Sequence, residues 1–275
     1  MSEAAATVSA LVLAGRRGEG DPLADSLAAA GGAAHHSLID VCGVPMLVRV
    51  VRVLRASPSI GAVAVCIDDP GALDCVAELE RARREGWLSI RQAAESPSRS
   101  VAEGIAAAGD GPVLVTTADH ALLAPEMIAR FLDRGTAEAD VWVGVVEESV
   151  VRGRYPETRR TYLRLGPDRI SGANLFLFRS PDAIRAAEFW VRAERYRKQP
   201  WRLAGVFGVR TLLAFLLRRL DLDGALARVS DAMGVRVRAV RLPFAEAAID
   251  VDRPADLALA ERILAARDAT SPRGR

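Results

Sequence analysis

The chain has 275 residues, of which 50% are hydrophobic, so it can bury a sizeable core in one large or two small domains. Its formal net charge of +2 gives no global field of the kind that attracts nucleic acid or acidic membrane surfaces. No stretch approaches the roughly 18–20 uninterrupted apolar residues of a membrane span, and the N-terminus lacks a basic signal-peptide region. We therefore expect a soluble, cytoplasmic protein with no nucleic-acid partner and no stable membrane insertion.

Short β-rich runs alternate with helical patterns, which indicates an α/β protein with a mostly parallel sheet and helices on both faces. Several predicted helices begin with proline near the first turn, where its missing N–H costs nothing. The predicted strands are Ser9–Ala14, Gly61–Ile67, Leu88–Arg91, Pro112–Thr116, Asp140–Val146, Tyr162–Leu165, Ser171–Phe178 and Val235–Leu242. The predicted helices are Pro45–Arg55, Ala72–Gly86, Ser98–Ala108, Pro125–Arg134, Pro181–Arg197, Trp201–Leu220, Asp223–Met233 and Pro254–Arg267.

No repeat or linker divides the chain, so residues 1–267 are predicted to form a single domain with a disordered tail over residues 268–275. Residues 18–34, rich in Gly and Ala, are expected to form a loop over the site. Residues 180–233 are expected to form a helical insertion. The apolar residues within Trp201–Leu220 fit a packed lid or a homodimer surface, and a cradle for a lipid-linked acceptor is the alternative.

The cysteines are Cys42, Cys66 and Cys75. Their spacing fits neither a CxxC pair nor a zinc site, and their odd number argues against a disulfide framework. We expect all of them to be reduced and buried.

The first predicted strand ends in the glycine turn Leu13-Ala14-Gly15, followed by Arg16 and Arg17. Bare backbone N–H groups and guanidinium groups can bind phosphate oxygens, so this turn is a candidate phosphate site. No G-x-G-x-x-G pattern follows the strand, which argues against a nicotinamide-dependent dehydrogenase. In open α/β sheets, ligands bind beyond the carboxyl ends of the strands, which is where this turn lies.

Carboxylates follow two other segments. Asp119 ends the run Thr116-Thr117-Ala118-Asp119, and Asp250 and Asp252 precede Arg253-Pro254. Such carboxylates could hold the Mg²⁺ that accompanies a nucleoside triphosphate. The alternatives are a turn or N-cap role for Asp119, and an N-cap role for Asp252 at the helix that begins at Pro254.

Six elements in this order resemble the MobA-like NTP transferases, from about Ser9 to about Leu264. They are Leu13-Ala14-Gly15 with its arginines, His36-Ser37-Leu38-Ile39 leading to Gly43-Val44-Pro45-Met46, Ser100, Thr117-Ala118-Asp119, Gly172-Ala173-Asn174 and Ile249-Asp250-Val251-Asp252-Arg253-Pro254. The resemblance implies a Rossmann-like three-layer α/β/α nucleotidyltransferase fold with a mostly parallel mixed sheet.

The resemblance also implies a reaction, in which a nucleoside triphosphate is joined to a small phosphorylated acceptor, a sugar or alcohol phosphate, with Mg²⁺ and release of pyrophosphate. The acceptor phosphate has a second pKa of about 6, so it is largely a dianion near neutral pH and already a competent nucleophile. Catalysis then reduces to alignment and charge neutralisation, and no acid–base relay is required.

The resemblance assigns roles to individual residues. Asp119 and Asp252 would hold the metal, and Asn174 would face the acceptor. Independently of the resemblance, Arg159, Arg160 and Arg164 flank Tyr162 in a short basic hairpin that we expect to face the acceptor, and the alternative is a solvated charged strand. By the resemblance, Arg16, His36 and Asp119 would be catalytic. Nucleotide binding would fall to Leu13, Ala14, Gly15, Arg16, Arg17, Ser100 and Asp119.

His36 is the main departure from the family pattern, which normally has a lysine at this position. Lys198 is the only lysine in the chain. Histidine is partly charged near neutral pH, with an unperturbed pKa of about 6.5. Three outcomes are open: His36 substitutes, a loop arginine substitutes, or the protein is a catalytically impaired nucleotide- or sugar-phosphate-binding module. A fourth interpretation makes His35 and His36 an exposed polar turn.

Overall fold

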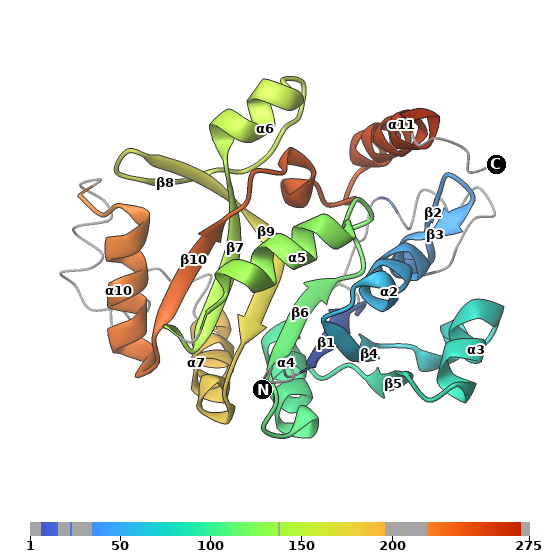
Figure 1. Cartoon of the computed structure of the whole chain (residues 1–275), viewed down its shortest axis with the longest axis horizontal. Helices are drawn as coiled ribbons and strands as arrows, with labels where there is room; N and C mark the ends of the chain where they lie inside the picture. Colours follow the sequence, from blue (N-terminus) through green and yellow to red (C-terminus); the bar gives the residue numbers. More distant parts are fainter. Residues whose placement is uncertain (1–6, 16–22, 24–34, 137, 196–218, 271–275) are drawn as a thin grey trace, which may run out of the picture.

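The computed structural model describes residues 7–15, 23, 35–136, 138–195 and 219–270, and its centre is an eight-stranded sheet. The strand order is β10-β7-β9-β6-β1-β4-β5, with β8 paired to β9 (Figure 1). β9 is antiparallel to β6 and β7, whereas β1, β4, β5 and β6 are parallel neighbours, as are β7 and β10. The strands are β1 Val8–Leu13, β4 Ile60–Ile67, β5 Leu88–Gln92, β6 Val113–Thr117, β7 Val141–Glu147, β8 Leu163–Leu165, β9 Asp168–Phe178 and β10 Val237–Arg241.

Helices cover both faces of the sheet, which gives the three layers of the predicted α/β/α fold (Figure 1). On one face the core is shared with α2 (Met46–Ala56), α3 (Ala77–Arg84), α5 (Pro125–Arg134) and α6 (Glu148–Arg154). On the other it is shared with α4 (Pro97–Ala108), α7 (Ile184–Arg195) and α10 (Leu222–Met233). Ala10 and Val12 of β1 belong to the first core, and Leu11 belongs to the second. This double burial explains why the strand is apolar at nearly every position.

A third apolar cluster lies at the carboxyl ends of the parallel strands. There α11 (Pro254–Thr270) packs Leu259 and Ile263 with Val41 and Leu122. A small hairpin, β2 (Asp40–Val41) and β3 (Val44–Pro45), lies beneath this helix at the same edge of the molecule. The helix therefore holds together the loops that follow the strands.

The predicted strands are confirmed to within a few residues, but several other elements differ. The predicted helix Ala72–Gly86 is confirmed over α3 (Ala77–Arg84) but begins too early. A 3₁₀ turn, η2 (Pro70–Leu73), precedes α3, and the chain turns between them so that both Leu73 and Leu79 are buried. Likewise a 3₁₀ turn, η3 (Pro181–Ala183), begins the segment predicted as one helix from Pro181. The 3₁₀ turns η1 (His36–Leu38) and η4 (Ala245–Ala248), the hairpin and α6 were not predicted.

Two predictions about the ends of segments also change. α11 continues to Thr270, so the predicted tail is wrong for residues 268–270, and residues 271–275 lie outside the described part. Nearly all of the loop 18–34 and of the predicted helix Trp201–Leu220 lie outside it as well.

The cysteines form no disulfide, but only Cys66 is buried, so the expectation that all three are buried is wrong. Cys42 occupies the tip of the β2–β3 hairpin, where it and Gly43 have φ angles of 52° and 78°. Positive φ at both central residues is the geometry of a type I′ turn, which projects from the surface. Cys75 is exposed in the turn between η2 and α3.

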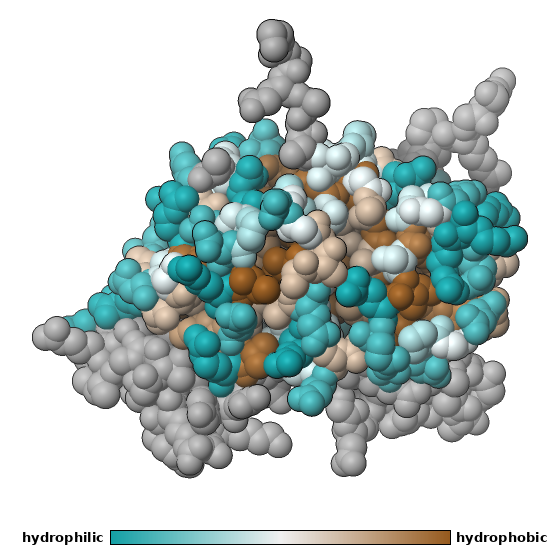
Figure 2. All heavy atoms as spheres, turned by 90° about the horizontal axis from the view of Figure 1, so that it is seen from below, coloured by the Kyte–Doolittle hydropathy of each residue, from teal (hydrophilic) through white to brown (hydrophobic). Residues whose placement is uncertain are grey.

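The surface seen from the amino ends of the parallel strands carries hydrophobic residues in small separate groups among hydrophilic ones (Figure 2). Within the described residues, the large hydrophobic side chains that are exposed are Leu163 and Trp190. No helix in this part of the chain has the length and apolar character needed to cross a membrane.

Gly104 lets α4 approach β1 closely. A Cβ atom at Gly104 would lie 2.5 Å from Cδ2 of Leu11, which is buried in the core. Gly153 in α6 is a matched helical glycine, because nothing lies within 4 Å of its Cβ position. We predict that Gly104→Val lowers the free energy of unfolding by about 1–3 kcal/mol relative to Gly153→Val, since only the first overpacks the core. Urea unfolding of both variants measures this, and equal stabilities would contradict it.

Candidate active site

The candidate site lies where β1, β4 and β6 end side by side. Beyond the strand ladder, the amide of Ala14 donates to Cys66 O at 2.7 Å, and the amide of Ala118 donates to Leu13 O at 2.9 Å. These bonds hold the glycine turn at Gly15 next to the loop that carries Asp119. The two segments that the sequence placed at strand ends therefore share one edge of the sheet.

A backbone hydrogen bond joins the two segments that carry the predicted metal ligands. The amide of Val251 donates to Asp119 O at 3.1 Å, which places Asp252 beside Asp119. Asp119 is buried, and Thr117 Oγ1 donates a hydrogen bond to its Oδ1. The Asp119 carboxylate is therefore fixed in orientation by its own strand end.

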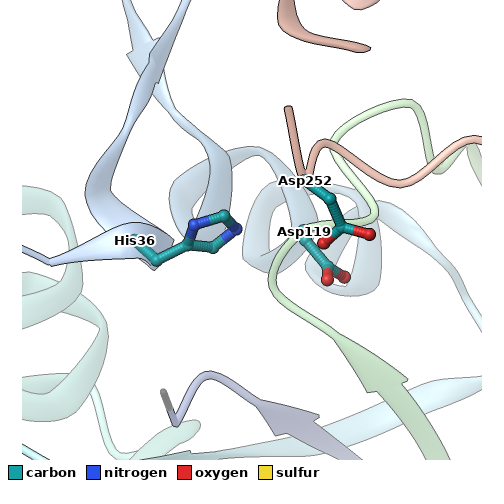
Figure 3. A group of neighbouring side chains, drawn as sticks. All are labelled: His36, Asp119 and Asp252. Carbon is teal, nitrogen blue, oxygen red and sulfur yellow. The ribbon is translucent and has the colours of Figure 1, made fainter. Parts of the chain in front are cut away.

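His36 completes a cluster with these two aspartates (Figure 3). Its ring points toward the two carboxylates, and one ligand atom from each of the three residues lies within 4.8 Å of the others. Two ligands on opposite sides of one octahedral Mg²⁺ are roughly 4.2 Å apart, given metal–oxygen bonds of about 2.1 Å. Two carboxylates and an imidazole at this spacing fit a divalent cation.

Asp250 precedes the same helix as Asp252 and is the other aspartate that could complete the cluster, but it has different contacts. Asn174 Nδ2 donates to Asp250 Oδ1 at 2.8 Å, and Arg160 Nη2 donates to Asp250 O at 2.6 Å. Asp252, and not Asp250, therefore belongs to the cluster with Asp119 and His36. The side-chain amide of Asn174 therefore stabilises the segment that carries Asp252.

The contacts of Arg160 do not support its predicted role in a basic hairpin that faces the acceptor. Its side chain is only 8% exposed and lies between Asp250 and the buried Asp256, with Nη2 at 3.4 Å from Asp256 Oδ1. Arg160 thus fixes the segment that carries Asp252 through its contacts with Asp250 and Asp256. Arg159 is exposed, and its carbonyl oxygen accepts a hydrogen bond from Arg253 at 2.9 Å.

His35 has a role that the sequence did not reveal. It is only 2% exposed, which rules out the exposed polar turn for this residue. Its Nδ1 accepts a hydrogen bond from the amide of Ser37, and its Nε2 lies 2.9 Å from Asp68 Oδ1 at the end of β4. With Nδ1 as the acceptor, Nε2 carries the proton and donates to Asp68. The pair ties η1, which carries His36, to the edge of the sheet.

Ser100 and Gly15 border the other side of the site. Ser100 is buried, and its Oγ accepts a hydrogen bond from the amide of Ala94 at 2.9 Å, which holds the loop between β5 and α4. A Cβ atom at Gly15 would lie 3.4 Å from Cβ of Ala93 in that same loop. The N-cap of α4 is Ser96, whose side chain accepts a hydrogen bond from the amide of Arg99. Arg16 and Arg17 lie outside the described residues.

Comparison with known protein families decides which class of protein carries this site. The model of the MobA-like NTP transferase domain matches residues 10–236, more than three quarters of the chain. The chain belongs to the MobA-like NTP transferase domain family. As a member it is a nucleotidyltransferase. The match ends before Asp252, so the place of Asp252 in the site rests on the geometry described above.

Solved structures share the fold over almost the whole chain. A hypothetical transferase from Thermus thermophilus is 29% identical, with a TM-score of 0.73, and the alignment covers 91% of this chain and 99% of that one. CMP:2-keto-3-deoxy-manno-octonic acid synthetase in complex with CTP is 14% identical, with a TM-score of 0.57 and coverage of 95% and 99%. A 2-C-methyl-D-erythritol 4-phosphate cytidylyltransferase, also from Thermus thermophilus, is 18% identical, with a TM-score of 0.53 and coverage of 94% and 98%. No match was found among curated proteins.

Asn174 combines its hydrogen bond to Asp250 with a left-handed backbone conformation, at a φ of 46°. A left-handed conformation costs most non-glycine residues about 1–2 kcal/mol. We predict that Asn174→Ala unfolds with a free energy about 1 kcal/mol lower than Asn174→Gly, because both lose the amide but only alanine is strained. Urea unfolding provides the measurement. Equal stability of the two variants would show that the backbone relaxes at this position.

His120 follows Asp119 and is fully buried, and neither ring nitrogen has a hydrogen-bond partner among the described residues. Burial, with a smaller contribution from Arg267, lowers its pKa from 6.5 to about 4. As pH falls from 6.5 toward about 4, the unfolded chain gains a proton here that the folded protein does not. The free energy of unfolding should therefore decrease over this range, by about 3 kcal/mol in total.

His120→Leu should remove this contribution. We therefore predict that the free energy of unfolding of the variant, relative to that of the wild-type protein, increases as pH is lowered from 6.5 to about 4. Carboxylates titrate in both proteins, and the difference between them isolates His120. Urea unfolding across this pH range, with a chelator present to remove metal ions, measures the difference. A difference that does not change with pH would contradict the prediction.

Proposed function

We propose that this protein transfers a nucleotidyl group from a nucleoside triphosphate to a small phosphorylated acceptor, a sugar or alcohol phosphate, and releases pyrophosphate. The observation that carries the proposal is the cluster of Asp119, Asp252 and His36 beside the glycine turn of β1. Membership of the MobA-like NTP transferase family supports the same reaction class.

In the proposed reaction, an oxygen of the acceptor phosphate forms a bond to the α-phosphorus while the bond from that phosphorus to the bridging oxygen of pyrophosphate breaks. The acceptor is already an anion near neutral pH, so the protein has no proton to remove. A divalent cation, which the family resemblance implies is Mg²⁺, would neutralise charge on the triphosphate when bound at the site. Asp119 and Asp252 would hold it.

The rest of the site would align the two substrates. Gly15, with Leu13 and Ala14, would bring backbone close to the triphosphate, and Arg16 and Arg17 follow this turn in the sequence. Ser100 holds the loop that faces Gly15, so it would position that loop for binding of the nucleotide. Asn174 and Arg159 would border the acceptor side, and Arg160 would hold the Asp252 segment.

The second candidate is a binding module that has lost turnover. The observation that favours it is His36, which stands where the family normally has lysine. Pyrophosphate release separates the two candidates, because a binding module would form complexes with nucleotide but release none. The protein should be incubated with each nucleoside triphosphate, divalent cation and a panel of sugar and alcohol phosphates, and nucleotidylated products should be detected by mass. CTP is the first nucleotide to test, since proteins of the same fold are named cytidylyltransferases.

We predict that Asp119→Asn reduces turnover by at least about 100-fold, the lower end for removing one group that stabilises charge in a transition state. Asp133→Asn is the matched control, because Asp133 lies at the far end of α5 with its side chain 74% exposed. The rate of pyrophosphate release measures both variants. Turnover by Asp119→Asn equal to that of Asp133→Asn would remove Asp119 from the site.

A further inference from the structure

The donor set of the cluster contains a nitrogen atom, which distinguishes it from an all-oxygen magnesium site. Asp119 and Asp252 offer carboxylate oxygens, and His36 offers a ring nitrogen within 4.8 Å of both. Mg²⁺ is bound in proteins mainly through oxygen atoms and keeps several waters. Imidazole nitrogen instead suits first-row transition metals, for which affinity generally rises from Mn²⁺ through Fe²⁺ and Co²⁺ to Ni²⁺ and Cu²⁺.

His36 is presented to the carboxylates by a rigid support. The amide of Leu38 donates to His35 O at 2.9 Å, and the amide of Ile39 donates to His36 O at 3.1 Å, which closes the 3₁₀ turn η1. Ser37 is buried, and His35 bonds to Asp68 at the end of β4. Because the turn is held at both ends, the backbone position from which His36 extends is set before any ligand binds.

The charges in the cluster also suit a dication. Metal-bound histidine is neutral, so the three ligands together would carry two negative charges from the aspartates. A lysine at this position would cancel one of those charges and cannot ligate while protonated. The rival interpretation is that His36 is an imidazolium that forms ion pairs with the carboxylates and so takes over the charge of the usual lysine.

We propose that His36 is a direct ligand of the cation held by Asp119 and Asp252, and that this site therefore favours a first-row transition-metal dication over Mg²⁺. The inference rests on the proposed function only because it uses the same residues. Cation binding is measured without nucleotide or acceptor, so failure to find turnover would leave it standing.

Nitrogen coordination can be observed directly with Mn²⁺ alone. The chain has only three histidines, which makes the source of a nitrogen signal traceable. Electron spin-echo envelope modulation of Mn²⁺ bound to the wild-type protein should show coupling to a directly bound ¹⁴N nucleus. The coupling should disappear in His36→Ala and His36→Lys. It should persist in His35→Gln, whose amide can still donate to Asp68.

Affinity gives a second measurement. Titration of free Mn²⁺ by its electron paramagnetic resonance signal, with Mg²⁺ as the competitor, should show tighter binding of Mn²⁺ to the wild-type protein. His36→Ala should weaken Mn²⁺ binding by roughly 10- to 100-fold, the range seen even for loss of groups that support a ligand, and should weaken Mg²⁺ binding less.

Three results would overturn the proposal. They are absence of Mn²⁺ binding at the site, bound Mn²⁺ without nitrogen coupling in the wild-type protein, and an unchanged Mn²⁺-to-Mg²⁺ affinity ratio in His36→Ala. The second result would favour the imidazolium interpretation, in which His36→Lys keeps both metal binding and turnover. The spectrum of the wild-type protein decides the question even if the variants fold poorly.

Discussion

The arrangement of the site depends on one backbone hydrogen bond, from the amide of Val251 to Asp119 O. It joins the loop after β6 to the segment after η4, and these are far apart in the sequence. Their carboxylates repel each other at this spacing, so the surrounding structure has to hold them together. Arg160, Asn174 and the packing of α11 supply that support from three directions.

The strand pattern predicted the parts of the site that end strands, whereas His36 and Asp252 were assigned only through the family resemblance. A strand buried on both faces is visible as an apolar run, and its carboxyl end is the ligand-binding edge of the sheet. Gly15 and Asp119 each follow such a run, so their shared edge was predictable. Asp250 and Asp252 were not separable in this way, because both precede the same helix and only their contacts with Asn174 and His36 distinguish them.

The parts that the sequence did not predict are held by short elements without periodicity. The 3₁₀ turn η1 spans three residues, so no repeating pattern marks it, and the bond from His35 to Asp68 joins segments that give no local sign of contact. α6 has seven residues and follows directly on the valine-rich strand β7, so the sequence pattern does not show where the helix begins. The resemblance assigned His36 to the site from the sequence, but the buried supporting role of His35 is visible only in the fold.

The position of α11 in the chain has a consequence for how the enzyme is made. Asp252 and α11 follow every strand of the sheet, so a growing chain can synthesise and pair all of those strands before the second carboxylate leaves the ribosome. Until that segment emerges, the cluster of Asp119 and His36 lacks Asp252. The cation site that we propose would therefore be completed last, by the segment that follows β10.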